Sequence, residues 1–276
     1  MPELPEVETI RRNLEIAMVG RHIAAARAHR ADLRRPFPPE LAERIKRRRI
    51  AALDRRAKYL IVVLDGGLDM LIHLGMSGRI MLGKAEGAPG RHEHFSIDLN
   101  DGQRISLHDP RRFGIVDLVP AADLDAHPLL RGLGPEPLSR TFTGPVLAAA
   151  LKGRSTTIKA ALMDQRRVAG LGNIYVCEAL FRARLSPKRS AGTVTGARAT
   201  KLAAAIKAVL KDALKAGGST LRDHRLPSGE LGYFQHRFRV YDRAGQPCPN
   251  GRGGKHLIKR MVQGGRSTFF CSTCQK

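Results

Sequence analysis

The strongest constraint on the fold is a change in hydrophobic periodicity part-way along the chain. Between residues 59 and 119 the apolar residues come in short runs, and Phe95, Ile97 and Leu99 alternate with polar neighbours. Asn100-Asp101-Gly102 then supplies the residues that tight hairpin turns prefer. The pattern is typical of an antiparallel β-sandwich or barrel, with strands expected at Tyr59–Leu64, Asp69–Leu74, His94–Leu99, Gln103–His108 and Ile115–Val119.

Helical periodicity flanks this strand-rich stretch. Residues 5–18 predict a helix because apolar residues recur at three- and four-residue steps, with Gly20 as a stop. The glycine- and proline-rich stretch Gly132–Pro145 indicates a domain boundary. The basic run Arg44–Arg49 is interpreted as a solvated helix face, with distant phosphate contact as the alternative. Beyond the boundary, helices are expected at 146–152, 156–165, 173–183 and 197–216.

Residues 241–276 are rich in Gly, Arg and Cys and contain few apolar residues. They cannot build a core of their own, so a metal or docking against another part of the chain must order them. The expected class is therefore α+β in three parts. These are a β-sandwich with flanking helices over 1–133, a helical domain over 134–240 and a terminal hairpin over 241–276.

The charge of the chain points to a polyanionic partner. There are 48 Lys+Arg against 25 Asp+Glu, which gives a net charge of +23. Nucleic acid is the leading interpretation, a membrane surface is a weaker one, and a generally basic protein is the third. No apolar run approaches the roughly 20 residues of a membrane span, and the start lacks a signal-peptide pattern. We therefore expect a cytoplasmic protein without a membrane partner.

The first residues carry a candidate nucleophile. If Met1 is removed, Pro2 presents a free secondary amine, which can attack a sugar carbon and form a cationic imine. An α-amino group has a reference pKa of about 8, against about 10.4 for lysine, so more of it is free base near neutral pH. Glu3 is close enough to move protons for that amine. An ordinary chain start before a helix is the alternative.

Two loops flanked by glycine are candidate DNA contacts. Asp109–Gly114 carries Arg111, suited to a phosphate or base edge, and Phe113, whose ring can wedge into stacked bases. His73–Gly78 presents Met76 at its tip. The alternative is that Met76 and Phe113 are core residues.

A third candidate is the turn between two predicted helices. Gly170 and Gly172 allow a tight turn that brings backbone amides near a ligand. Asn173 would begin the next helix, where free N–H groups favour an anion such as phosphate. An ordinary turn is equally compatible with these residues.

Three cysteines crowd the C-terminus. Cys271 and Cys274 have the spacing of a zinc knuckle, and Cys248 lies upstream. A full site needs a fourth ligand soon after Cys248, where this chain has Gly251. Completion by His256, completion by water, and no metal at all are the three alternatives.

Together these motifs resemble those of the bacterial formamidopyrimidine-DNA glycosylases, also called 8-oxoguanine DNA glycosylases. The resemblance covers essentially the whole chain in order. It implies an N-terminal β-sandwich with flanking helices, a helix–two-turn–helix domain and a zinc-finger β-hairpin. It rests on Met1–Thr9, Arg55–Leu60, His73–Gly78, Asp109–Gly114, Leu133–Leu138, Ala169–Tyr175, Gly232–Phe234 and Gln263–Cys271.

The resemblance also implies a function, namely base-excision repair of oxidised purines (8-oxoguanine and formamidopyrimidines) in damaged double-stranded DNA. The enzyme would be a monomeric, bifunctional DNA glycosylase (a hydrolase) and AP lyase of the bacterial cytoplasm, associated with the nucleoid. It would carry one structural zinc. The family usually brings four cysteines to the finger, whereas this chain brings Cys248, Cys271 and Cys274.

Residue roles are implied position by position. Pro2 matches the nucleophile that forms the Schiff base, and Glu3 matches its acid/base partner. Lys58 matches the lysine that aids β-elimination, and Arg266 the finger arginine linked to δ-elimination. Other residues match family positions that bind DNA, fill the gap left by the everted nucleotide or line the pocket. These residues are Glu6, Met76, His92, Arg111, Phe113, Arg154 and Asn173.

Two other functions are compatible with part of the sequence. An endonuclease VIII-like enzyme would use the same chemistry on oxidised pyrimidines, but that sister family typically has glycine where Leu4 stands, and Gly232–Phe234 also favours purines. A non-catalytic DNA-binding protein would explain the charge and the loops. It would not explain Pro2-Glu3 together with Lys58.

Overall fold

The structure, a computed structural model, describes residues 2–219, 232–251 and 256–276. The chain forms two compact units, Met1–Arg131 with Gly217–Tyr233 and Gly132–Ala216 with Phe234–Lys276. The second unit begins inside the stretch in which the sequence indicates a boundary. None of the helices within the described ranges combines the length and apolar character that a membrane crossing demands.

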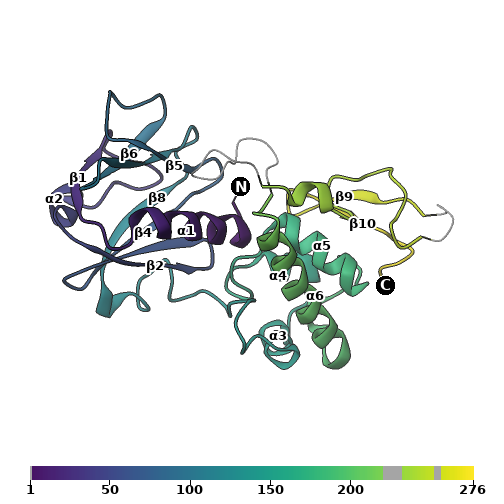
Figure 1. Cartoon of the computed structure of the whole chain (residues 1–276). Helices are drawn as coiled ribbons and strands as arrows, with labels where there is room; N and C mark the ends of the chain where they lie inside the picture. Colours follow the sequence, from purple (N-terminus) through teal and green to yellow (C-terminus); the bar gives the residue numbers. More distant parts are fainter. Residues whose placement is uncertain (1, 220–231, 252–255) are drawn as a thin grey trace. The chain divides into compact units, whose positions relative to one another are not determined.

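The first unit is a β-sandwich (Figure 1), as predicted. One sheet has the order β2 (Ile50–Arg56), β3 (Tyr59–Leu64), β4 (Leu68–His73) and β8 (Ile115–Pro120). The other has the order β1 (Ile23–Ala28), β6 (Glu93–Leu99), β7 (Gln103–His108) and β5 (Arg79–Lys84). All neighbouring strands are antiparallel.

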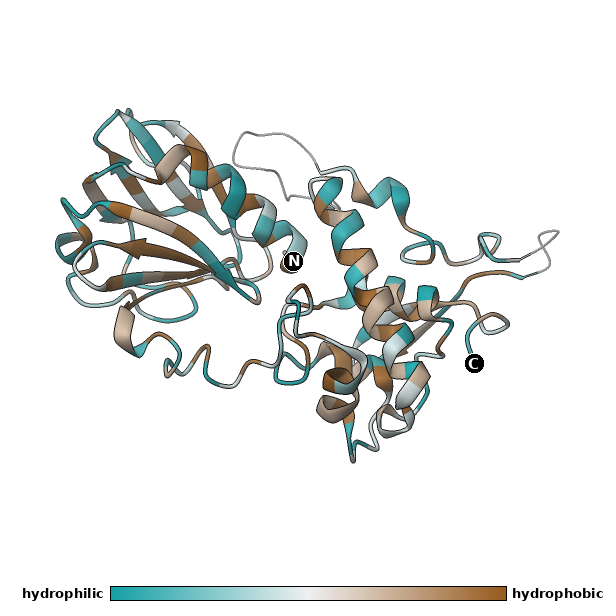
Figure 2. Ribbon diagram, turned by 60° about the horizontal axis from the view of Figure 1, so that its bottom comes forward, coloured by the Kyte–Doolittle hydropathy of each residue, from teal (hydrophilic) through white to brown (hydrophobic). Residues whose placement is uncertain are grey.

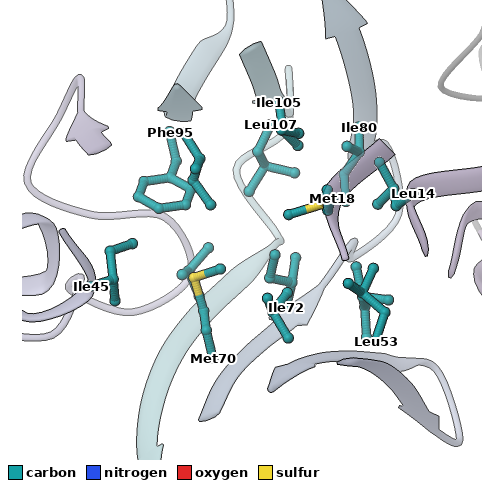
Figure 3. Packing of buried hydrophobic residues seen from close by; sticks show 14 of the residues in the cluster. Leu14, Met18, Ile45, Leu53, Met70, Ile72, Ile80, Phe95, Ile105 and Leu107 are labelled. Carbon is teal, nitrogen blue, oxygen red and sulfur yellow. The ribbon is translucent and has the colours of Figure 1, made fainter. Parts of the chain in front are cut away.

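The core of this unit lies between the two sheets and helix α1 (Leu4–Met18). Leu14 and Met18 of α1 contribute to the same buried cluster as Ile72 of β4 and Leu107 of β7 (Figure 3). In β6, Phe95, Ile97 and Leu99 belong to this cluster, whereas the polar residues Ser96 and Asp98 between them do not. This alternation of residue types fits a sheet that turns one face toward the core. The predicted helix 5–18 is confirmed and ends two residues before Gly20.

Several elements of the first unit were not predicted. They are β1, β2, β5, helix α2 (Leu41–Ile45) and a short 3₁₀ turn at Ala121–Asp123. The interpretation of Arg44–Arg49 as a helix face is wrong beyond Ile45, where α2 ends. Arg47 has a φ of 63°, which breaks the helix, and its N–H donates to the Ile23 carbonyl. The run is largely solvent-facing, as expected, but as a turn that leads into β2.

The second unit is helical and ends in a hairpin. Its helices are α3 (Gly144–Leu151), α4 (Ile158–Met163), α5 (Asn173–Ala183) and α6 (Gly196–Lys215), with 3₁₀ turns at Ala191–Thr193 and Phe234–Arg237. Strands β9 (Lys259–Gln263) and β10 (Arg266–Phe270) pair antiparallel. Helix α6 packs against α3 and α5. Hydrophobic residues run along the strands of the sandwich, whereas the helices carry both hydrophobic and hydrophilic residues (Figure 2).

The C-terminal hairpin docks on α5. Cys177 and Phe181 of α5 share a buried cluster with Ile258 and Phe269, and the cysteines at 248 and 271 belong to it as well. This contact supplies the core that residues 241–276 cannot build alone.

Candidate functional site

The first residues are buried at the start of α1. Pro2 and Glu3 are buried, with Glu3 only 2% exposed, and Glu3 is the N-cap of the helix. The Glu3 N–H donates to Glu6 Oε2 at 2.9 Å, as one half of a capping box. This capping box holds the backbone of the residue next to Pro2. The expected role of Pro2 as a nucleophile remains a prediction.

The carboxylate of Glu6 also reaches a distant segment of the same unit. Glu6 Oε1 accepts hydrogen bonds from the Ser219 N–H at 2.8 Å and from the Ser219 hydroxyl at 2.9 Å. Gly218 has a φ of +80°, and a Cβ there would lie 3.2 Å from Glu6 Oε1. Glycine thus permits this close approach. The expected role of Glu6 in a substrate pocket remains a prediction, and residues 220–231 lie outside the described ranges.

Lys58 lies in the tight turn between β2 and β3. It is only 7% exposed and follows Ala57, which has a φ of 53°. Its effect is visible at His73, whose pKa is lowered to about 4 by burial and then by the positive charges of Lys58 and Arg34. Neutral His73 accepts the Gly75 N–H at Nδ1 over 3.0 Å, so it orders the start of the 73–78 loop.

The two loops expected to meet DNA present their tips to solvent. Met76 is 40% exposed and Phe113 is 39% exposed, so neither is a core residue. The Arg111 guanidinium lies 4.6 Å from the centroid of the Phe113 ring. His92 precedes β6, has a φ of 69°, and accepts the Asp109 N–H at its carbonyl.

In the second unit, two helices hold the strand that begins with Arg266. The Asn173 side chain at the start of α5 donates to the Ser267 carbonyl at 2.9 Å. Lys159 of α4 donates to Thr268 Oγ1 at 2.6 Å and to the Ser267 carbonyl at 3.3 Å. Arg266 itself is exposed and available to a ligand.

Lys159 is a residue that the sequence analysis missed. It is 2% exposed, and burial is the first cause that lowers its pKa, with the nearby charge of Arg266 adding to it. The available signal was a lone lysine in the apolar segment 158–163. Of the other candidates here, Arg154 is exposed and Gly170 has a φ of 81°. Their expected contacts with DNA remain predictions.

Four side chains converge to form a candidate metal centre. Ligand atoms of Cys248, His256, Cys271 and Cys274 all lie within 4.8 Å of one another. The Cys248 and Cys274 sulfurs are 3.8 Å apart, and Cys274 Sγ lies 3.7 Å from His256 Nδ1. A tetrahedral zinc with Zn–S bonds of about 2.3 Å separates its sulfurs by about 3.8 Å. The residues therefore fit zinc, and His256 lies where it could complete the ligand set that the sequence left open.

The electrostatics of the cluster also favour a cation. Burial, together with the neighbouring thiols of Cys271 and Cys248, raises the pKa of Cys274 to about 12. Three thiolates cannot share so small a volume without a compensating positive charge, and zinc supplies that charge when it binds. The metal would be structural, because all four protein ligands close the coordination sphere.

Comparison with known proteins gives the family. Three family models match: the formamidopyrimidine-DNA glycosylase N-terminal domain at residues 1–116, its H2TH domain at 133–225, and a zinc finger found in FPG and IleRS at 255–276. A formamidopyrimidine-DNA glycosylase of Cereibacter sphaeroides is 55% identical over 286 aligned residues, covering 100% of both chains. The chain belongs to the formamidopyrimidine-DNA glycosylase family.

Solved structures of this glycosylase family have the same fold. The MutM (Fpg) protein from Thermus thermophilus matches with a TM-score of 0.87 and 44% identity, over 99% of this chain and 98% of that one. A Lactococcus lactis Fpg mutant in complex with DNA containing Fapy-dG matches with a TM-score of 0.90 and 33% identity, over 100% of both chains. The α+β fold with a helix–two-turn–helix domain and a zinc-finger hairpin is confirmed.

A second missed residue, Glu178, secures the finger of this glycosylase. Glu178 is fully buried on α5, and its carboxylate accepts three successive backbone N–H groups, those of Arg239, Val240 and Tyr241, at 2.9–3.1 Å. The segment that leads into the finger is therefore tied to the helix that the finger packs on. A lone acidic residue in an apolar helix was the only sequence signal.

We expect Glu178→Ala to destabilise the second unit by about 3 kcal/mol or more, because it leaves three buried donors unsatisfied. Glu178→Gln retains one acceptor oxygen and should restore part of that loss. Denaturant unfolding of both variants measures the difference. An alanine variant as stable as the parent protein would contradict the anchoring role.

Proposed function

We propose that this protein removes oxidised purines, such as 8-oxoguanine and formamidopyrimidines, from duplex DNA and then cuts the strand at the abasic site. The observation that carries the proposal is the buried, capped Pro2-Glu3 start of α1 in a chain of this family. The Lactococcus lactis relative was solved with Fapy-dG DNA, which supports purine lesions as the substrate class. The enzyme acts as a monomer on chromosomal DNA in the bacterial cytoplasm.

The chemistry follows from a secondary amine beside a carboxylate. The Pro2 nitrogen attacks C1′, the glycosidic bond breaks, and the damaged base leaves with the proton that the amine gives up. Glu3 donates a proton to the sugar ring oxygen as the ring opens to the imine. Lys58 assists removal of the C2′ proton as the 3′ phosphate leaves, and Arg266 stabilises the 5′ phosphate that leaves in the second elimination.

Recognition requires access to C1′, which a stacked base blocks. The nucleotide must therefore be everted at a cost of a few kcal/mol, which inserted side chains offset. We assign entry into the stack to Met76, Arg111 and Phe113; the exposure of Met76 and Phe113 and the contact of Arg111 with the Phe113 ring support this assignment. Phosphate contacts position the strand, and we assign them to His92, Arg111, Arg154, Asn173 and Arg266.

The test is cleavage of duplexes that carry 8-oxoguanine, an oxidised pyrimidine or no lesion, with both product ends identified. We expect rapid cutting at 8-oxoguanine, with phosphate at both ends of a one-nucleotide gap. Preferred cutting at the pyrimidine would instead indicate an endonuclease VIII-like specificity. Tight binding without any cutting would indicate a non-catalytic damage-binding protein.

Phe113→Ala should weaken binding to an abasic duplex by about tenfold or more, because stacking on a base contributes about 1–3 kcal/mol. Binding to single-stranded abasic DNA should change far less, since no stack has to be opened there. Titration of both ligands measures the contrast. Met81→Ala removes an equally exposed apolar side chain from β5, 40% exposed, and serves as the control. Equal losses on both DNA forms would contradict the wedge role.

A further inference from the structure

Asp109 is a buried carboxylate that connects the two solvent-facing loops of the sandwich. It follows β7 directly and is 0% exposed. Its Oδ1 accepts the Ser77 hydroxyl at 2.5 Å, and its Oδ2 accepts the Gly114 N–H at 2.7 Å. One side chain therefore ties the loop that carries Met76 to the far end of its own loop.

The backbone of Asp109 is equally well fixed. Its carbonyl lies 2.9 Å from His94 Nε2 and accepts the Arg112 N–H at 3.1 Å. Ser77 links Asp109 to Arg111, because the Ser77 Oγ also accepts the Arg111 N–H at 3.2 Å. The chain of contacts therefore runs from the sheet, through Asp109 and Ser77, to the residue whose guanidinium stacks on Phe113.

The two loops approach so closely that a side chain larger than that of glycine does not fit between them at Gly75. A Cβ at Gly75, which has a φ of +59°, would lie 2.5 Å from the carbonyl carbon and oxygen of Phe113. A Cβ at Gly114 would lie 3.2 Å from Asp109 Oδ2. Because the backbones of Gly75 and Phe113 are in contact there, we expect a change in the Asp109 hydrogen bonds to change the relative position of the two tips.

We propose that Asp109 is the positioning residue for the loop tips: through Ser77 and Gly114 it holds Met76, Arg111 and Phe113 in the arrangement that fills the gap in the duplex. The inference rests on the proposed function, since it assigns to Asp109 the preorganisation of that wedge. Asp109 does not touch the reacting atoms. It acts on the net free-energy cost of distorting the duplex, because a wedge that is already ordered offsets more of that cost.

The experiment compares duplex and single-stranded DNA in the full-length protein. Asp109→Ala should weaken binding to a duplex with a tetrahydrofuran abasic analogue by about tenfold or more, because it removes two hydrogen bonds to a charged group. Borohydride trapping on single-stranded abasic DNA should stay close to that of the parent protein. Ser77→Ala, which removes one link without removing the carboxylate, should show a smaller loss of the same kind.

A double-variant cycle separates positioning from general stability. If Asp109 acts through the loop tips, the Asp109→Ala/Phe113→Ala double variant should bind the duplex almost as tightly as Phe113→Ala alone. Fully additive losses, or equal losses on duplex and single-stranded DNA, would overturn the proposal. If Asp109→Ala does not fold, Ser77→Ala decides by the same criteria.

Asp98→Ala is the matched control. Asp98 is also a buried aspartate of the sandwich, 7% exposed, and it pairs with Arg27 and Arg104 outside the two loops. Its loss should lower stability and leave the ratio of duplex to single-strand binding unchanged. Failure of the proposed function would look different, because the parent protein itself would then form no adduct on any abasic DNA.

Discussion

A Pro2→Gly variant is expected to lose most of the covalent adduct that borohydride traps on 8-oxoguanine duplex DNA, by about a hundredfold or more. Glycine still offers an amine, but a primary one without the ring that holds the nitrogen in place. Displacement of a reacting group by about 1 Å can cost a hundredfold in rate. The buried position of Pro2 and the capped backbone of Glu3 are the structural reasons to expect that sensitivity.

The same experiment contains its own chemical check. An amide nitrogen is not nucleophilic, so the protein can act through Pro2 only after Met1 has been removed. Intact mass should therefore show a chain that begins at Pro2. Pro5→Ala, in the first turn of the same helix, should still form the adduct. An undiminished adduct from Pro2→Gly, or full activity in a preparation that retains Met1, would reject the assigned nucleophile.

Loss of His256 should remove most of the zinc and, with it, most of the affinity for DNA. Purified protein is expected to contain one zinc per chain, held by Cys248, His256, Cys271 and Cys274. Structural zinc contributes about 10–16 kcal/mol of apparent binding free energy in isolated fingers. A site reduced to three ligands therefore competes poorly with chelators. Because Cys248 and Cys271 belong to the cluster that packs on α5, we expect loss of the metal to loosen the hairpin and to displace Arg266.

Metal analysis of His256→Ala after mild chelation measures this effect, and cobalt substitution adds a spectrum that reports three sulfurs and one nitrogen. His236→Ala, which changes an exposed histidine of the same unit outside the cluster, is the control. DNA affinity should fall together with zinc content. An active, folded parent protein without zinc would make the finger a metal-free variant, and full zinc in His256→Ala would point to another fourth ligand.

Much of the fold could be predicted because its elements are locally encoded. Strands β3 and β7 and helix α5 begin and end at the predicted residues. Strand β1, Ile-Ala-Ala-Ala-Arg-Ala, could not be predicted, since alanine favours helix and only pairing with β6 makes this segment a strand. Tertiary hydrogen bonding overrides propensity there.

Within the site, the division between sequence and structure has a physical cause. Three features could be predicted: the amino-terminal amine, the loops with flanking glycines and the knuckle cysteines. Within each of them the residues that act together are neighbours along the chain, so their spacing alone predicts their chemistry. His256, Lys159, Glu178 and Asp109 act on partners that the chain brings close only when it folds. A local pattern carries no information about such partners, because the hydrogen-bond or ligand geometry is set by packing. The sequence by itself therefore determined the kind of chemistry, whereas the tertiary structure decided which residues complete and support it.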